Sequence, residues 1–182
     1  MTSIVFSSKD ISRAVTRITH EILEKNKGVN NLALVGIRTR GVALAQRIKN
    51  KINTIENVEI DFGILDITLY RDDLSSGKIN TIIEKTNIPF PLDGKQIVLI
   101  DDVLFTGRTI RAAIDALIDF GRPSTIQLGV LIDRGHRELP IRPDYVGKNI
   151  PTSKNNRVQV LLSEEDGVDE VRIKDSLSSS DS

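Results

Sequence analysis

The amino-acid sequence predicts an α/β fold in which helices flank a mainly parallel β-sheet. Along the chain, short apolar runs typical of buried strands alternate with longer segments that carry apolar residues at helical spacing. Hydrophobic residues make up 39% and charged residues 27% of the 182 residues, as in globular proteins with a buried core. We expect one domain over residues 1–176, with a flexible flap at about 70–93, and a disordered serine-rich tail at 177–182.

The first half of the chain predicts two helices and two strands. Ile11 and Ile22 lie three turns apart on one face of the first helix, which Ser7 or Ser8 can cap and Gly28 ends. In chain order we expect a helix over 9–26, a strand over 32–37, a helix from 42 onward and a strand over 58–69. The first strand is apolar throughout, which indicates burial on both faces of a sheet.

The second half repeats the alternation and then changes character. We expect a strand over 96–100, a helix over 109–120, a strand over 125–132, and short strands and turns over 141–173. Residues 70–93 are polar and rich in turn formers, which favours an exposed flap rather than core. Because ligands bind at the carboxyl ends of parallel strands, we expect the chemistry directly after each strand.

Composition excludes several classes of function. The chain has no cysteine, so it has no disulfide scaffold, no thiol nucleophile and no cysteine-based zinc site. Aromatic residues are only 4%, which argues against a platform of stacked rings for nucleic acid. The formal net charge is +0, so any nucleic-acid site must be a local basic patch. An apolar run long enough for a membrane helix and a signal-peptide pattern are both missing, so we expect a cytoplasmic protein without a membrane partner.

The residues after the strand at 96–100 predict an anion site. The segment Asp101–Thr109 contains two carboxylates, a turn with glycine, and the start of a helix. A helix N-terminus presents free N–H groups and a partial positive charge, which suit a phosphate, and Gly107 lets the backbone approach it. The carboxylates suit sugar hydroxyls a few ångströms away. The segment therefore predicts a cradle for a ribose 5-phosphate, and it lacks the Gly-Lys-Ser/Thr of a Walker A loop.

Taken singly, each of these residues also fits an ordinary strand–turn–helix, but adjacent acids at the end of a buried strand need a reason. The whole run resembles the phosphoribosyl-diphosphate (PRPP) signature of the type I phosphoribosyltransferases. The resemblance implies the fold of that family, including a small hood. It also implies that Asp101 and Asp102 hold the ribose 2- and 3-hydroxyls and that Phe105–Thr109 wraps the 5-phosphate. Phe105 departs from the family pattern, because a hydroxyl residue often stands there.

Two further segments complete the resemblance. The loop Arg38–Gly41 follows the strand at 32–37 and opens a helix. Alone it would read as a solvated basic turn, but it is similar to the diphosphate-binding loop of the same family. The family closes an element over its substrates where the flap begins, which implies that Arg71 reaches the diphosphate and acts in catalysis. The resemblance implies Mg²⁺ shared between diphosphate and ribose oxygens, with no metal held directly by protein ligands.

The acceptor of the phosphoribosyl group is indicated by other segments. The ranges 16–21, 66–73, 131–142 and 146–152 are similar to those of the bacterial pyrimidine-operon regulators, a family that doubles as uracil phosphoribosyltransferases. The resemblance extends from about Ile11 to Leu162. It implies conversion of uracil and PRPP to UMP and diphosphate, and binding of the pyrimidine operon leader mRNA when UMP or UTP is present. It also suggests homodimers or higher assemblies.

The predicted sites can be stated residue by residue. For PRPP and UMP we expect Arg38, Thr39, Arg40, Gly41, Asp101, Asp102, Val103, Leu104, Phe105, Thr106, Gly107, Arg108 and Thr109. For the base pocket we expect Asp133 and Arg134, which a salt-bridged turn explains equally well. For RNA we expect Thr16, Arg17, His20, His136, Arg137, Arg142 and Lys148, each of which alone fits a solvated face. Two alternatives stay open: a salvage enzyme without an RNA role, and a UMP sensor with little turnover.

Overall fold

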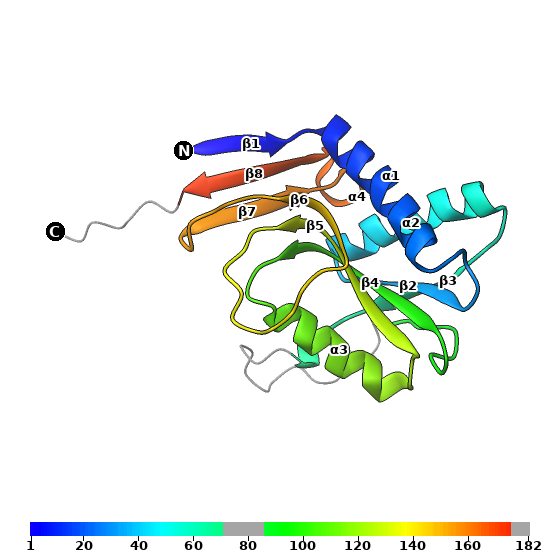
Figure 1. Cartoon of the computed structure of the whole chain (residues 1–182). Helices are drawn as coiled ribbons and strands as arrows, with labels where there is room; N and C mark the ends of the chain where they lie inside the picture. The colour runs from blue at the N-terminus through cyan, green and yellow to red at the C-terminus, as the bar shows by residue number, and fades with distance from the viewer. Residues whose placement is uncertain (71–85, 176–182) are drawn as a thin grey trace.

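The computed structural model describes residues 1–70 and 86–175. Its centre is a parallel sheet with strand order β3-β2-β4-β5-β6 (Figure 1). The strands are β2 (Leu32–Ile37), β3 (Asp61–Leu65), β4 (Gln96–Leu104), β5 (Thr125–Asp133) and β6 (Tyr145–Asn149). The predicted α/β class and parallel sheet are confirmed.

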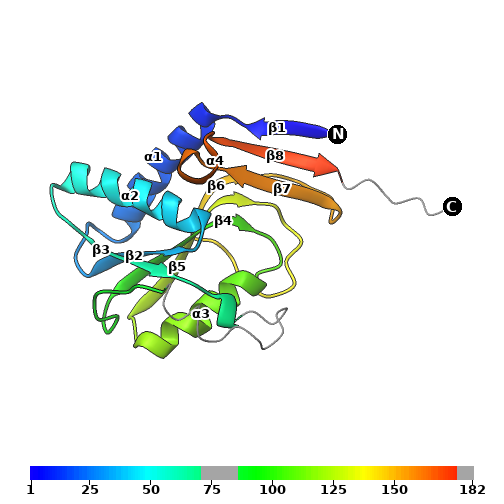
Figure 2. The same cartoon turned by 180° about the vertical axis from the view of Figure 1, so that it is seen from behind.

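Helices cover both faces of this sheet, which explains why its central strands are apolar throughout. Helices α1 (Ser8–Lys25) and α2 (Arg40–Glu56) pack on one face, and α3 (Arg108–Phe120) packs on the other (Figures 1 and 2). The sheet therefore separates two apolar clusters. Ser7 caps α1 through a reciprocal pair of hydrogen bonds with Asp10, as the capping prediction required.

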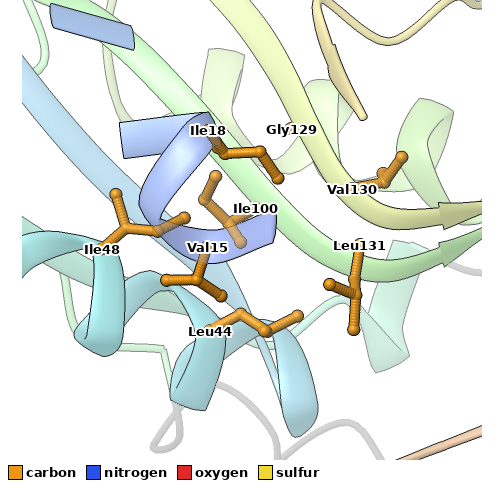
Figure 3. Close-up of a pocket in the computed structure, with 8 residues that line it drawn as sticks. All are labelled: Val15, Ile18, Leu44, Ile48, Ile100, Gly129, Val130 and Leu131. Carbon is orange, nitrogen blue, oxygen red and sulfur yellow. The ribbon is translucent and has the colours of Figure 1, made fainter. Parts of the chain in front are cut away.

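The cluster beneath α1 and α2 contains a small apolar cavity (Figure 3). Val15 and Ile18 reach it from α1, and side chains from α2, β4 and β5 complete its lining. The cavity has a volume of about 10 Å³, no more than one water molecule occupies. Its lining offers no hydrogen-bond partner for such a water, so we assign this cavity to packing and not to ligand binding.

A second, antiparallel sheet forms the hood. It has the order β1-β8-β7, with β1 (Thr2–Phe6), β7 (Asn156–Leu161) and β8 (Glu170–Asp175), and it includes the short helix α4 (Ser163–Asp166). Figure 1 shows this sheet beside the amino-terminal end of α1. The turns and short strands expected over 141–173 agree with it in kind, but the sequence patterns did not predict that the first residues of the chain complete the hood.

Two boundaries differ from prediction. The strand expected over 58–69 is limited to 61–65, and a 3-10 helix, η1 (Thr68–Tyr70), follows it. The strand expected over 96–100 continues to Leu104 and so includes the acid pair. The carboxylates are thus held by the sheet itself rather than by a loop.

Part of the predicted flap belongs to the core. Asn87 pairs with Ile64 of β3 through two backbone hydrogen bonds, both 2.8 Å, and Leu92 is only 1% exposed. Ile88, Phe90 and Leu92 alternate with polar residues or proline, a strand-like pattern that turn-forming neighbours obscured. The expectation of an exposed flap is therefore wrong for Ile88, Phe90 and Leu92, which pack on the core, while Asn87, Pro89, Pro91 and Asp93 between and around them are exposed. Arg71 and residues 71–85 lie outside the described residues, as does the tail.

Within residues 1–70 and 86–175, the longest helices are amphipathic, and none combines the length and apolar character needed to cross a bilayer.

Candidate functional site

A polar cleft of about 450 Å³ opens at the carboxyl ends of β2, β3 and β4. Its walls come from three separate parts of the chain. They are lined by Ile37, Arg38, Thr39, Arg40, Asp66, Ile67, Thr68, Asp101, Asp102, Val103 and Thr109. The two loops that the sequence singled out, one basic and one acidic, therefore face a single cleft.

The acid pair stands at the end of β4. Asp101 is 7% exposed, and its Oδ1 accepts the backbone N–H of Asp102 at 2.9 Å. The Oδ1 of Asp102 in turn accepts the N–H of Val103 at 2.8 Å. Burial, and then the neighbouring charge of Asp102, raise the pKa of Asp101 well above its usual range. Two adjacent carboxylates at the end of a largely buried strand are placed to accept hydrogen bonds from a ligand with hydroxyl groups or to attract a cation.

The segment after β4 forms the phosphate loop, defined here as Phe105–Thr109. Gly107 has φ +95°, a left-handed conformation that side chains rarely adopt, and α3 begins at the next residue. The N–H of Arg108 lies 3.3 Å from the hydroxyl oxygen of Thr106. Thr109, in the first turn of α3, lines the cleft together with Asp101 and Asp102, so the start of this helix lies beside the acid pair, where a helix N-terminus suits a phosphate.

The basic loop Arg38–Gly41 approaches β4 closely from the other side. A Cβ atom at Gly41 would lie 2.5 Å from the carbonyl oxygen of Ile100, so only glycine permits this packing. The peptide bond between Arg38 and Thr39 is cis. Arg40 forms a two-pronged ion pair with Asp166 of the hood, with distances of 3.1 and 2.7 Å. The hood therefore restrains one arginine of this loop.

Arg134 and Asp133, expected in the base pocket, lie just behind the phosphate loop. Arg134 is 6% exposed, and its guanidinium lies 3.9 Å from the centre of the Phe105 ring. Its Nη2 donates to the carbonyl oxygen of Ser153 at 2.9 Å, and burial lowers its pKa. Asp133 accepts hydrogen bonds from Gly135 and Arg137. Both residues thus stabilise the segment that follows β5 and packs behind the phosphate loop. Neither is among the residues that line the cleft.

Four of the expected RNA-binding residues are exposed: Arg17 and His20 on α1, Lys148 on β6, and Arg142 in the segment before β6. Arg17 of α1 donates to the carbonyl oxygens of Val146 and Gly147 in the edge strand β6. Lys148 of β6 lies above the ring of Phe6, which precedes α1. We call these four exposed residues the basic surface. Thr16 is half-buried on the same helix.

The remaining two expected RNA-binding residues are partly buried and bonded to other parts of the chain. The Nε2 atom of His136 lies 2.6 Å from the carbonyl oxygen of Thr152, and its ring meets Phe105 edge to face. Arg137 is 24% exposed, and its guanidinium donates to three protein acceptors. Charge alone suggested that Arg137 faces solvent, but the structure directs it toward the phosphate loop.

Two polar residues of the cleft, Asp66 and Thr68, were missed by sequence reasoning. Asp66 is 8% exposed and accepts hydrogen bonds from both the N–H and the hydroxyl of Thr68, at 3.0 and 2.6 Å. Both follow β3 directly, which is where ligand-binding residues are expected. Their position after a strand was not recognised, because the strand was predicted to continue to residue 69 and so to include both of them.

Comparisons with known proteins agree with this geometry. The family model described as "Phosphoribosyl transferase domain" matches residues 1–165. The bifunctional protein PyrR of Acetivibrio thermocellus is 63% identical over 171 residues, which cover 94% of this chain and 93% of that protein. The protein of the same name from Clostridioides difficile is 57% identical, with 94% and 97% covered.

Solved structures show the same fold at low sequence identity. A hypoxanthine phosphoribosyltransferase from Staphylococcus aureus is 20% identical with a TM-score of 0.65, covering 83% of this chain and 79% of that one. The hypoxanthine phosphoribosyltransferase of Trypanosoma cruzi is 18% identical with a TM-score of 0.64, covering 82% of each. At this identity the likeness supports the fold and not the base that is used.

Proposed function

Since this chain belongs to the phosphoribosyl transferase domain family and, within it, to the bifunctional PyrR proteins, we propose that it joins two activities. It converts uracil and PRPP to UMP and diphosphate, and it regulates pyrimidine genes by binding leader mRNA when uridine nucleotides are present. One observation carries the proposal: the acid pair at the end of β4 and Thr109 of the phosphate loop line the same cleft as Arg38, Thr39 and Arg40 of the basic loop.

The residues of the cleft suit transfer of a phosphoribosyl group. Asp101 and Asp102 accept hydrogen bonds from the ribose hydroxyls, and the phosphate loop holds the 5-phosphate. As the bond from C1 to diphosphate breaks, C1 gains positive charge, which the two carboxylates stabilise. The electron pair leaves with diphosphate, whose negative charge Arg38 and Arg40 bind. Uracil N1 then bonds to C1, and its proton passes to the released diphosphate or to water.

A magnesium ion fits this cleft. Members of the family generally use Mg²⁺ with PRPP, and Mg²⁺ prefers oxygen ligands and retains several waters. Asp101, Asp102 and Thr39 supply oxygens on facing walls of the cleft. Bound Mg²⁺ would neutralise charge on the diphosphate. Among the described residues there is no cluster of three or more His, Cys, Asp or Glu placed for a metal, so we propose that PRPP and water complete its coordination.

The other parts of the proposal follow from the family. We propose that uracil lies near the end of β5, where Asp133 and Arg134 shape the pocket from behind. Arg71, outside the described residues, is proposed to reach the diphosphate when the substrates are covered. We also propose a cytoplasmic homodimer or higher assembly, because a dimer would present two basic surfaces to one RNA. Light scattering of the purified chain measures that assembly.

The enzymatic half is tested by steady-state turnover. Release of UMP from uracil and PRPP is measured with hypoxanthine, which the structural neighbours use, as the competing base. We expect turnover with uracil and Mg²⁺ and at least a hundredfold lower kcat/KM for hypoxanthine. Binding of UMP with negligible turnover would instead identify a nucleotide sensor.

The regulatory half is tested by titrating the organism's own pyrimidine leader RNA. We expect UMP to tighten binding, and we expect the affinity to fall steeply with added salt because phosphates are contacted. A leader with its stem-loop scrambled is the control. If uracil turnover is normal and the leader binds no better than the control with UMP, the chain is a salvage enzyme alone.

A further inference from the structure

We infer that Arg137 is a positioning residue that couples the phosphate loop to the residues that bind RNA. The inference rests on the proposed function and adds a physical connection between its two halves. On this view Arg137 does not contact RNA. It holds the segment 133–142, which carries His136 and Arg142, against the loop that binds the nucleotide 5-phosphate.

The side chain of Arg137 donates hydrogen bonds both to the phosphate loop and to the segment 133–142. Its Nη1 donates to the carbonyl oxygen of Phe105 in the phosphate loop at 2.9 Å. Its Nε donates to the carbonyl oxygen of Ile141 at 3.0 Å, and its Nη2 donates to Asp133 at 2.6 Å. Every nitrogen of the guanidinium therefore has a protein acceptor. A side chain in this arrangement, with 24% exposure, is poorly placed to bind a phosphate of RNA.

The backbone of the same segment packs on the same loop. The carbonyl oxygen of Thr106 accepts the N–H groups of Glu138 and Leu139, at 2.9 and 3.2 Å. Arg108, at the start of α3, forms an ion pair with Glu138 at 2.9 Å. A Cβ atom at Gly107 would touch Leu139 and Ile141 at 3.4 Å. The segment thus contacts the phosphate loop along most of its length.

The ring of Phe105 provides a third connection. Arg134 lies over its face, and His136 meets it edge to face with the ring centres 6.2 Å apart. The departure of this chain from the hydroxyl residue often found at position 105 thus has a structural consequence. Phe105 gives up a side-chain hydrogen bond to a phosphate and instead contacts His136, a residue of the RNA-binding set.

These contacts predict the direction of the coupling. A phosphate bound by backbone N–H groups would fix the backbone of the phosphate loop, and the carbonyl oxygens of Phe105 and Thr106 in that loop accept hydrogen bonds from Arg137, Glu138 and Leu139. UMP therefore stabilises the arrangement in which His136 and Arg142 are fixed, and RNA binds that arrangement without a further ordering cost. By linkage, RNA must tighten UMP binding by the same factor.

The decisive measurement is the ratio of RNA affinities with and without UMP. Arg137→Gln and Arg142→Gln are matched variants, because each removes one positive charge from the same segment. In Arg137→Gln we expect UMP to raise the affinity for RNA by less than twofold. The affinity for RNA without nucleotide should change much less than the affinity with UMP. We expect Arg142→Gln to lower both affinities by one common factor. Equal loss of both affinities in Arg137→Gln would overturn the inference and identify Arg137 as an RNA contact.

A second measurement needs no RNA. Hydrogen exchange at the amides of Glu138 and Leu139 should slow when UMP binds the wild-type chain, and this protection should be lost in Arg137→Gln. Arg137→Lys, which keeps the charge but cannot serve three acceptors, should behave like Arg137→Gln. If UMP binds without slowing these amides, the coupling is wrong while the enzyme assignment stands. If the leader RNA does not bind but the amides are protected, the regulatory function fails and the contact between loops remains.

Discussion

The cleft and the basic surface both concentrate charge, but the chain builds them in opposite ways. The cleft takes most of its polar groups from two short segments, each directly after a strand, and the sheet brings those segments together. The basic surface takes single residues from α1, from β6 and from the segment before β6. Two acids of the cleft, Asp66 and Asp101, are buried although Arg38 is exposed, whereas all four residues of the basic surface are exposed.

This difference explains which predictions can be made from sequence and which effects mutations should have. A buried charge changes both the function and the stability of its surroundings, because its solvation depends on neighbouring groups. An exposed charge acts on a ligand with little effect on folding. Arg137 lies between these cases, since it belongs by sequence to the RNA-binding set and by contacts to the phosphate loop.

Replacement of an acid in the cleft should have the largest effect. Asp102→Asn keeps the size of the side chain but removes the negative charge that stabilises the ribosyl cation. We expect kcat/KM for PRPP to fall by about 10²–10³, the range seen when one aligned electrostatic group is lost. Steady-state kinetics at saturating uracil measures it. Nucleotide-free affinity for the leader RNA should be unchanged, and a parallel loss of RNA binding would contradict the separation of the two regions.

Sequence patterns predicted the cleft better than its surroundings for a physical reason. The acid pair, Gly107 and the loop Arg38–Gly41 are local signals, each tied to the end of one strand. The pair of Arg40 with Asp166 and the pairing of β1 with β8 join residues more than a hundred positions apart. No local sequence pattern predicts such contacts, because they depend on how the hood packs against the first part of the chain.

The predicted RNA-binding residues also show that a sequence does not predict long-range contacts. Helical spacing selected Arg17 and positive charge selected Arg137, although the first is half exposed and the second is 24% exposed and bonded to the phosphate loop. The sequence shows that a side chain is positively charged, but it does not show whether a backbone carbonyl oxygen lies close enough to accept its hydrogen bonds. Only the packing of 133–142 on the phosphate loop separates the two cases.

Arg142 provides a test on the exposed side of the comparison. Arg142→Ala should weaken leader RNA binding by about 1–1.5 kcal/mol, or roughly tenfold, and should reduce the salt dependence by about one phosphate contact. Fluorescence anisotropy over a range of salt concentrations measures both. Lys25→Ala is the control, because Lys25 is an exposed base of α1 that pairs with Asp144 and is not among the proposed RNA contacts. Equal losses in both variants would indicate attraction by charge alone.

Weakening the ion pair between the hood and the basic loop should have a smaller effect on activity. Asp166→Asn weakens the ion pair that restrains Arg40, and we expect the KM for PRPP to rise several-fold with a loss of about 1 kcal/mol in stability. Glu164→Gln is the matched control, because Glu164 pairs with Arg47, which is not among the cleft residues. The control should lose similar stability in a denaturant titration with its KM unchanged. If both variants raise the KM, the hood acts as a whole and Arg40 has no special part.

The smallest effect concerns stability and has an unusual sign. Burial raises the pKa of Asp101 in the folded chain above its unfolded value, so its protonated form favours folding. That contribution is full below about pH 4, where the unfolded chain also holds the proton, and it is lost as pH rises through the folded pKa. Asp101→Asn keeps an oxygen to accept the N–H of Asp102 but cannot ionise.

We therefore expect Asp101→Asn to lose turnover and yet to unfold at a higher temperature than wild type at pH 7 to 8. A gain of about 1 kcal/mol would raise Tm by roughly 2–4 °C in a chain of this size. The difference should shrink toward zero as the pH approaches 4, which calorimetry of both proteins across that range measures. A variant less stable than wild type at neutral pH would show that the ionised carboxylate stabilises the fold, and the unfavourable effect of burial on this charge would then be contradicted.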